Sequence, residues 1–86
     1  MNTFNLTIST PDGNAFNGEC VRLVLRGDEG DLAIMANHTP IITGVKPCTA
    51  KIEIDENTSK SAHIDGGLLT VSENKATLLC GIVTMG

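Results

Sequence analysis

The sequence predicts an all-β fold, an antiparallel sandwich or barrel of short strands, with residues 1–86 forming a single domain. The first reason is the recurrence of turn signals, such as Pro11-Asp12-Gly13 and Asp65-Gly66-Gly67, which combine strand-breaking residues with residues that tolerate unusual backbone angles. The second is that the runs between these turns are short, rich in β-branched residues and alternately apolar and polar. The chain shows no pattern of a long helix and no internal repeat or linker.

The expected strands share one apolar face that alternates with a polar face. The first shows this most clearly, because Phe4, Leu6 and Ile8 fall on one side and the residues between them are polar. Residues 81–86 are apolar but too weakly patterned to assign. In chain order the expected strands are Phe4–Thr10, Glu19–Arg26, a core segment containing Leu32 and Ile34, Thr49–Asp55, Lys60–Ile64, a strand containing Leu69 and Val71, and Lys75–Cys80.

Composition narrows the class of partner. The chain is 41% apolar and 19% charged, which is ordinary for a globular domain, and its net charge is −4. The six basic residues are scattered singly, so no basic stripe could neutralise phosphates, and two aromatic residues are too few to stack bases. We therefore expect no nucleic-acid partner.

The cysteines and the N-terminus indicate a reducing compartment. Cys20, Cys48 and Cys80 are odd in number, widely spaced and without a Cys-x-x-Cys motif, so we expect three buried free thiols rather than a zinc or redox site. The N-terminus lacks a signal segment, and no uncharged stretch reaches the length of about 18 apolar residues that a spanning helix needs. We expect a soluble, cytoplasmic-type chain, a result that is compatible with a position against a membrane complex.

The run from Gly27 to Pro40 carries the most information about function. Its acidic turn holds Asp28, Glu29 and Asp31, but the ligand spacing of a calcium loop is missing. Two interpretations stay open: a solvated turn, or a loop that docks electrostatically onto a complementary partner. His38, before Thr39-Pro40, either orders a corner through a backbone hydrogen bond or contributes to an interface.

The chain carries no recognisable catalytic motif. It lacks a Gly-x-Ser-x-Gly elbow and a phosphate-binding glycine loop. His63 alternates with apolar neighbours and is expected on a solvated strand face. We therefore expect a protein that is not itself an enzyme, without catalytic, cofactor-binding or metal-binding residues and without a cofactor.

A hairpin near the C-terminal end supports a competing interpretation. Glu73-Asn74-Lys75 resembles the hairpin that presents the modified lysine in lipoyl carrier domains, although Asn74 replaces the usual Asp and the hairpin lies late in the chain. The alternatives are thus a carrier domain modified at Lys75 and a β interaction module with an unassigned partner.

A series of motifs occurs in a fixed order between residues 4 and 80. They are Thr10-Pro11-Asp12-Gly13, Glu29-Gly30-Asp31-Leu32, His38-Thr39-Pro40-Ile41-Ile42-Thr43, Val45-Lys46-Pro47, Asp65-Gly66-Gly67 and Ala76-Thr77-Leu78-Leu79. This ordered set resembles the N-terminal sandwich domain of the epsilon subunit of rotary F-type ATP synthases. Three positions depart from the family pattern, since Ala36-Asn37 replaces Pro-Gly and Asp65 replaces Ser.

The resemblance implies a two-layer antiparallel β-sandwich of about ten short strands. It also implies a non-catalytic rotor-stalk subunit at the cytoplasmic face of the membrane. Such a subunit links the gamma shaft to the membrane c-ring and so couples ion translocation to ATP synthesis. The matching positions imply ring docking by Asp28, Glu29 and Asp31. They imply contact with the gamma subunit by His38, Ile41, Ile42 and Thr43. The C-terminal helical hairpin of relatives is absent from these 86 residues, so we expect neither ATP binding nor inhibition of hydrolysis.

Overall fold

Residues 2–86 are described by a computed structural model, in which the chain forms ten strands. The expected all-β fold is confirmed, and in the described range no helix is present that could cross a membrane. The strands are β1 (Phe4–Thr10), β2 (Gly13–Cys20), β3 (Arg22–Gly27), β4 (Gly30–Met35), β5 (Ile41–Val45), β6 (Cys48–Glu53), β7 (Ser59–Ile64), β8 (Gly67–Ser72), β9 (Lys75–Cys80) and β10 (Val83–Met85).

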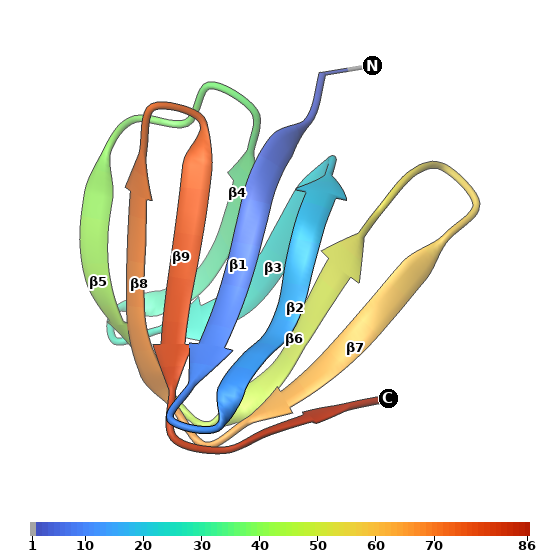
Figure 1. Ribbon diagram of the computed structural model, residues 1–86. Helices are drawn as coiled ribbons and strands as arrows, with labels where there is room; N and C mark the ends of the chain where they lie inside the picture. The colour runs from blue at the N-terminus through green and yellow to red at the C-terminus, as the bar shows by residue number, and fades with distance from the viewer. Residues whose placement is uncertain (1) are drawn as a thin grey trace.

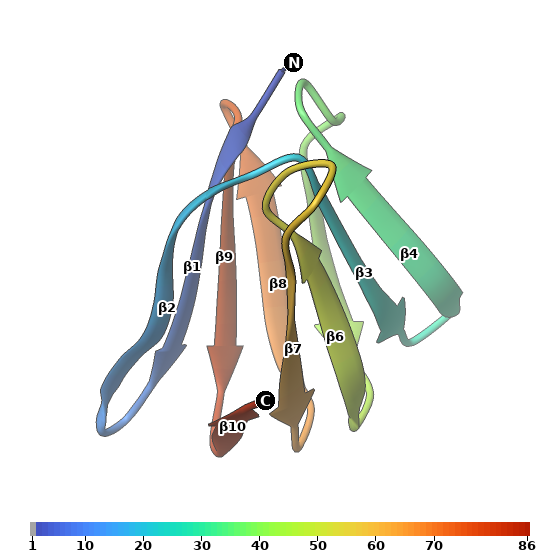
Figure 2. The ribbon, with the colours of Figure 1, turned by 90° about the vertical axis from the view of Figure 1, so that its right-hand side faces the viewer.

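The strands form two layers around one core (Figures 1 and 2). One layer has the order β2-β1-β9-β8-β5, and the other has the order β10-β7-β6-β3-β4. The layers are joined where Gly27 of β3 pairs with Val45 of β5. On the opposite side the end strands β2 and β10 line a common hollow, so that side is also nearly closed.

The structure differs from the expected strands at β2 and β3, in one pairing direction, and by the presence of β5 and β10, which the sequence did not predict. The segment Glu19–Arg26 is not one strand, because β2 ends at Cys20 and β3 begins at Arg22. β2 itself was missed, since it is a mostly exposed end strand with little apolar alternation to mark it. In addition, β1 and β9 pair in parallel, whereas the other pairs are antiparallel. Alternation within a strand reveals its buried face but not the direction of its neighbour.

The core is aliphatic, as the composition requires. Every apolar residue on the inner face of β1 is at most 2% exposed, which confirms the alternation read from the sequence. Burying an aliphatic side chain of this size contributes about 1.5–3 kcal/mol. The largest fully buried side chains are Phe4, Leu6, Ile8, Cys20, Leu23, Ile34, Ile52, Leu69 and Leu78.

The three thiols are not equally buried. Cys20 and Cys80 are buried, but Cys48 at the start of β6 is only half-buried. Burial, reinforced by the charge of Glu19, raises the pKa of Cys20 to about 11. Burial also raises the pKa of Cys80 to about 11, with the Asp65 carboxylate and Cys48 adding to the effect.

This difference predicts selective alkylation. Because the thiolate is the reactive form, iodoacetamide at pH 8 should label Cys48 first, while Cys20 and Cys80 react only after unfolding. Intact-mass measurement should therefore show one adduct on the native chain and three in denaturant. Simultaneous labelling of all three thiols in the native chain would contradict this ordering.

Candidate interaction surface

The acidic turn is the tight end of the β3–β4 hairpin. Asp28 and Glu29 form the turn between Gly27 and Gly30, and Gly30 has φ 127°, a conformation open mainly to glycine. All three carboxylates are exposed, and Arg26 Nε lies 3.1 Å from Asp31 Oδ1. That ion pair is solvent-exposed on both sides and contributes little to stability, so the turn keeps its carboxylates available to a partner.

Asp28 is held differently from the other two carboxylates. Its backbone N–H donates to the Gly44 carbonyl at 3.0 Å, and its carboxylate packs where a side chain at Gly44 would lie. A glycine at position 44 is therefore what lets the acidic turn lean against β5. Asp28 ties the turn to β5, whereas Glu29 and Asp31 face an adjoining cavity.

That cavity, which we call the β4–β5 hollow, has a volume of about 430 Å³. It brings together residues for which the family resemblance implies two separate partners, because Ile41, Ile42 and Thr43 of β5 line the same cavity as the acidic turn. The side chains that line it are those of Glu29, Asp31, Leu32, Ile41, Ile42 and Thr43. Residues expected to contact the ring and residues expected to contact the shaft thus form one continuous surface.

His38 lies apart from this hollow. The β4–β5 loop that carries it is at the end of the molecule opposite the β3–β4 turn (Figure 1). His38 is half-buried, and its Nδ1 lies 2.6 Å from the Thr39 carbonyl oxygen. The corner role with a backbone hydrogen bond is thereby confirmed, while its role as an interface residue stays a prediction.

Asn74 holds the His38 loop in place, a role that no local sequence pattern indicates. Glu73 and Asn74 form the two-residue β8–β9 turn with φ 51° and 62°, as a hairpin of primed type requires. From that turn the Asn74 side chain accepts a hydrogen bond from Asn37 N at 2.8 Å and donates one to the Thr3 carbonyl at 2.9 Å. Three segments far apart in sequence are joined by one amide.

We predict that Asn74→Gly lowers the free energy of unfolding by about 1–2 kcal/mol, because glycine keeps the turn geometry but loses both hydrogen bonds. The matched control is Glu73→Gly, which changes the same turn and should have a far smaller effect. Urea unfolding measures both. Equal losses for the two variants would show that turn geometry, not the amide, matters here.

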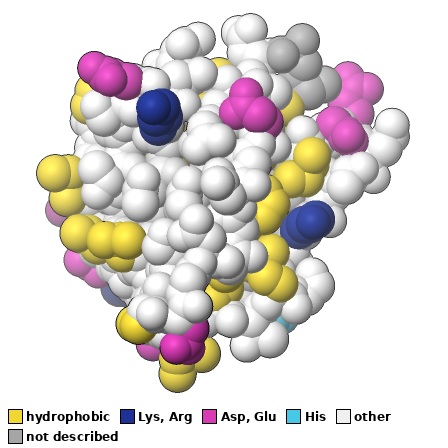
Figure 3. Space-filling view, in the orientation of Figure 1, with side chains coloured by type: hydrophobic (Ala, Val, Ile, Leu, Met, Phe, Trp, Pro, Cys, Tyr) yellow, Lys and Arg dark blue, Asp and Glu magenta, His cyan; other side chains and the backbone are white. Residues whose placement is uncertain are grey.

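The outer face of the β2-β1-β9-β8-β5 layer is nearly free of charge. Ile42 is 74% exposed and stands beside Thr70 and then Thr77 in the cross-strand row. Leu68 and Leu79 pair in the next row and are 42% and 48% exposed. Figure 3 shows this face as largely white and yellow, with charge confined to its margins.

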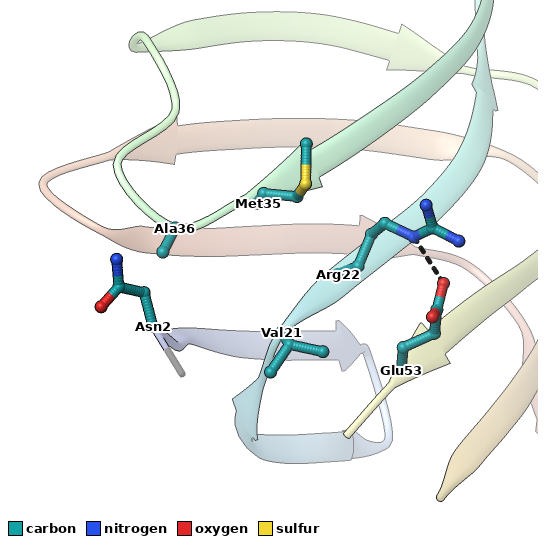
Figure 4. A pocket seen from close by; sticks show the side chains of 6 residues that line it. All are labelled: Asn2, Val21, Arg22, Met35, Ala36 and Glu53. Carbon is teal, nitrogen blue, oxygen red and sulfur yellow. Dashed lines mark hydrogen bonds and ion pairs between the residues drawn. The ribbon is translucent and has the colours of Figure 1, made fainter. Parts of the chain in front are cut away.

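The outer face of the other layer is different. Arg22 pairs with Glu53 at 2.5 Å and Arg26 with Asp31, so charges of both signs compensate each other there. A hollow on this side brings Arg22 and Glu53 together with Met35, and Figure 4 shows the ion pair along its wall. Its charges are already paired, which makes the uncharged face and the β4–β5 hollow the better candidates for docking.

The structure also bears on metal binding and on the carrier interpretation. Within residues 2–86 no three His, Cys, Asp or Glu side chains gather as metal ligands. Lys75, the residue of the carrier interpretation, is exposed, but it is the first residue of β9 and pairs with Ser72. The tip of that hairpin is formed by Glu73 and Asn74 instead.

Comparison with known proteins identifies the family. The model of the ATP synthase delta/epsilon chain β-sandwich domain matches residues 3–85. The ATP synthase epsilon chain of Delftia acidovorans is 33% identical over 86 residues, which cover all of this chain and 62% of the relative. The chain thus spans less than two thirds of the length of that curated relative.

Two solved structures share the fold. A chain in the mitochondrial ATP synthase of Euglena gracilis, solved with its c-ring, superposes with a TM-score of 0.90 at 16% identity, over 96% of this chain and 53% of that one. A chain in the central stalk and c-ring of the Tetrahymena thermophila enzyme gives 0.80 at 20% identity, over 93% and 64%. Together with the family match over nearly every residue, the sandwich shows that this chain belongs to the ATP synthase delta/epsilon chain β-sandwich domain family.

Proposed function

We propose that this domain is a non-catalytic coupling piece of an ATP synthase rotor, which holds the gamma shaft to the membrane c-ring. In this role it transmits rotation and so couples ion translocation to ATP synthesis, from the cytoplasmic face of the membrane and without entering it. The observation that carries the proposal is the continuous surface in which exposed Ile42 adjoins the carboxylates of Glu29 and Asp31. Membership of the family supports the assignment of the partners.

The two parts of the surface suit two kinds of contact. Ile42 and its uncharged neighbours on the outer face offer apolar area, which suits a tight contact with the shaft. Ile41 and Thr43 lie beside Ile42 in β5, and His38 lies in the loop that precedes this strand. Exposed carboxylates give register and association rate more than affinity, which suits docking of Asp28, Glu29 and Asp31 onto polar ring loops.

The proposal is tested by co-expression with the gamma subunit from the same source. We expect a stable complex through affinity capture and size exclusion at low and moderate salt. Absence of a complex under both conditions would contradict the proposal. In the same preparations the isolated chain should neither bind nor hydrolyse ATP, and a clear calorimetric signal with ATP would count against a purely mechanical role.

The acidic turn can be tested separately. Glu29→Lys with Asp31→Lys should weaken attachment to the c-ring by about tenfold or more, because two attractive charges become repulsive. The fold should be unaffected, since both side chains are exposed. The control is the same charge change at Glu56→Lys with Glu73→Lys, two exposed carboxylates outside the hollow. Equal ring binding by the two double variants would remove the docking role of the turn.

The carrier interpretation stays as the alternative. It rests on the exposure of Lys75 beside a two-residue hairpin turn. Expression together with lipoate ligase, followed by intact-mass measurement, decides it. Modification of Lys75 would support the carrier function, and an unmodified chain would leave that function without support.

A further inference from the structure

β4 is paired along one side only. In the part of the chain that the structure describes, its single neighbour is β3, with pairs from Arg22–Met35 to Gly27–Gly30. The edge of β5 that is not paired with β8 is also largely open, since it meets β3 only at Val45. Figure 2 shows β4 at the margin of the molecule. The β4–β5 hollow therefore lies along an open seam between the two layers.

The unpaired backbone groups can be assigned to residues. Asp28 N donates to the Gly44 carbonyl and the Arg26 carbonyl accepts from Lys46 N, so the backbone groups of 26 and 28 face β5. Backbone groups alternate in direction along a strand, so those of Gly27 face β4 instead. Across the hairpin, Gly30, Leu32 and Ile34 then face β3. The N–H and C=O groups of Asp31, Ala33 and Met35 consequently point to the open edge.

An open edge of this kind accepts an extended peptide as an additional strand. β4 has neither proline nor lysine, two residues that commonly protect an exposed edge, and its one charged side chain is Asp31. Leu32 and Ile41 give the hollow an apolar floor. Met35, 53% exposed, stands at the other end of the edge, beside Arg22 in Figure 4.

The charges around the seam select the occupant. Glu29 and Asp31 line the hollow at one end, and no basic residue lines it among those described. Arg26 approaches it only through its pair with Asp31, and Lys46 bonds to Arg26 through the backbone. A matching strand carries a Lys or Arg opposite Asp31 and apolar side chains turned inward over Leu32 and Ile41.

We propose that an extended segment of the gamma shaft pairs with β4 and closes this seam. The assignment to the shaft rests on the proposed function, because Ile41, Ile42 and Thr43 belong both to the expected shaft contact and to the hollow. The segment has a recognisable pattern. Its residues opposite Met35 and Ile34 are apolar, the residue opposite Ala33 is unrestricted, the residue opposite Leu32 is apolar and the residue opposite Asp31 is basic. The side chains opposite Ile34 and Leu32 face inward.

The first experiment measures backbone hydrogen exchange in the full chain. On addition of the gamma subunit from the same source, the amides of Asp31, Ala33 and Met35 should exchange at least about tenfold more slowly, because each would donate to the added strand. If gamma binds while these amides exchange as before, strand addition is wrong and the proposed function stands. If gamma does not bind at all, both are overturned.

The second experiment uses a pair of variants at one position. Ala33→Pro removes an N–H that points to the open edge, so it should leave the domain folded and weaken gamma binding by about tenfold or more. The control Ala33→Thr keeps the N–H and should bind like the original chain. Equal affinity of the folded Pro and Thr variants would overturn the inference. Should the Pro variant unfold, the exchange measurement on the original chain decides.

A second copy of the chain is the competing occupant. An edge-to-edge dimer would protect the same amides in the isolated chain at high concentration. Size exclusion with light scattering detects it, and we expect a monomer. A dimer that Ala33→Pro dissociates would overturn the assignment of the edge to the shaft.

Discussion

Gly67→Ala is expected to unfold most of the protein under conditions in which the original chain is stable. A Cβ at this position would overlap the backbone carbonyl of Leu79 and lie 3.2 Å from Cys80 Sγ. The obstructing group is backbone of β9, which is paired on both sides, with β8 and with β1, and cannot move away. We expect a loss of about 3 kcal/mol or more, a large share of the total for a domain of this size.

Gly18→Ala provides the matched control. Its Cβ would meet Phe16 Cζ at 3.5 Å, an ordinary contact, in the end strand β2. We expect a change below about 1 kcal/mol. Urea unfolding of the three proteins gives the comparison. A Gly67→Ala protein with the same midpoint as Gly18→Ala would show that the close approach of β8 and β9 does not constrain the fold.

Ile42→Asn is expected to reduce binding to the gamma subunit by about 100-fold, while the fold stays intact. At 74% exposure Ile42 contributes little to the core, so its substitution acts mainly on the complex. Burying an isoleucine contributes about 1.5–3 kcal/mol, and an amide forced into the same contact must also lose its water. Together these effects correspond to an increase of about 100-fold in the dissociation constant.

The control for that variant is Ile82→Asn. Ile82 is 67% exposed and precedes β10, away from the hollow, so the same chemical change should leave gamma binding unaltered. Titration calorimetry or biolayer interferometry on the purified proteins measures both affinities. Equal affinities for the two variants would remove Ile42 from the contact.

The local features of this fold could be predicted from local patterns. Strict alternation from Phe4 to Ile8 identified the buried face of β1, and the turn at Glu73-Asn74 was visible from its residue types. β2 could not be predicted, because an exposed end strand needs few apolar residues. Parallel pairing of β1 with β9 depends on residues about 70 positions apart, which no local pattern encodes.

The candidate surface, too, could be predicted from the sequence only in part. The sequence motifs identified Glu29, Asp31 and Ile42 as candidate contact residues. Their meeting in one hollow could not be predicted, because it depends on β5 crossing from one layer toward the other beside Gly44. Gly44 matters because the Asp28 carboxylate packs against it, and Asn74 matters because it bonds to the His38 loop. Neither contact can be recognised from the sequence alone.

The central claim is that this chain joins shaft to ring, and its place in the assembled complex tests that claim most directly. The measurement is affinity purification of the tagged chain from detergent-solubilised membranes of its source, followed by quantitative mass spectrometry of what accompanies it. We predict the gamma subunit in equimolar amount together with the c-ring. Recovery of the chain without either partner, or with an unrelated enzyme, would contradict the account.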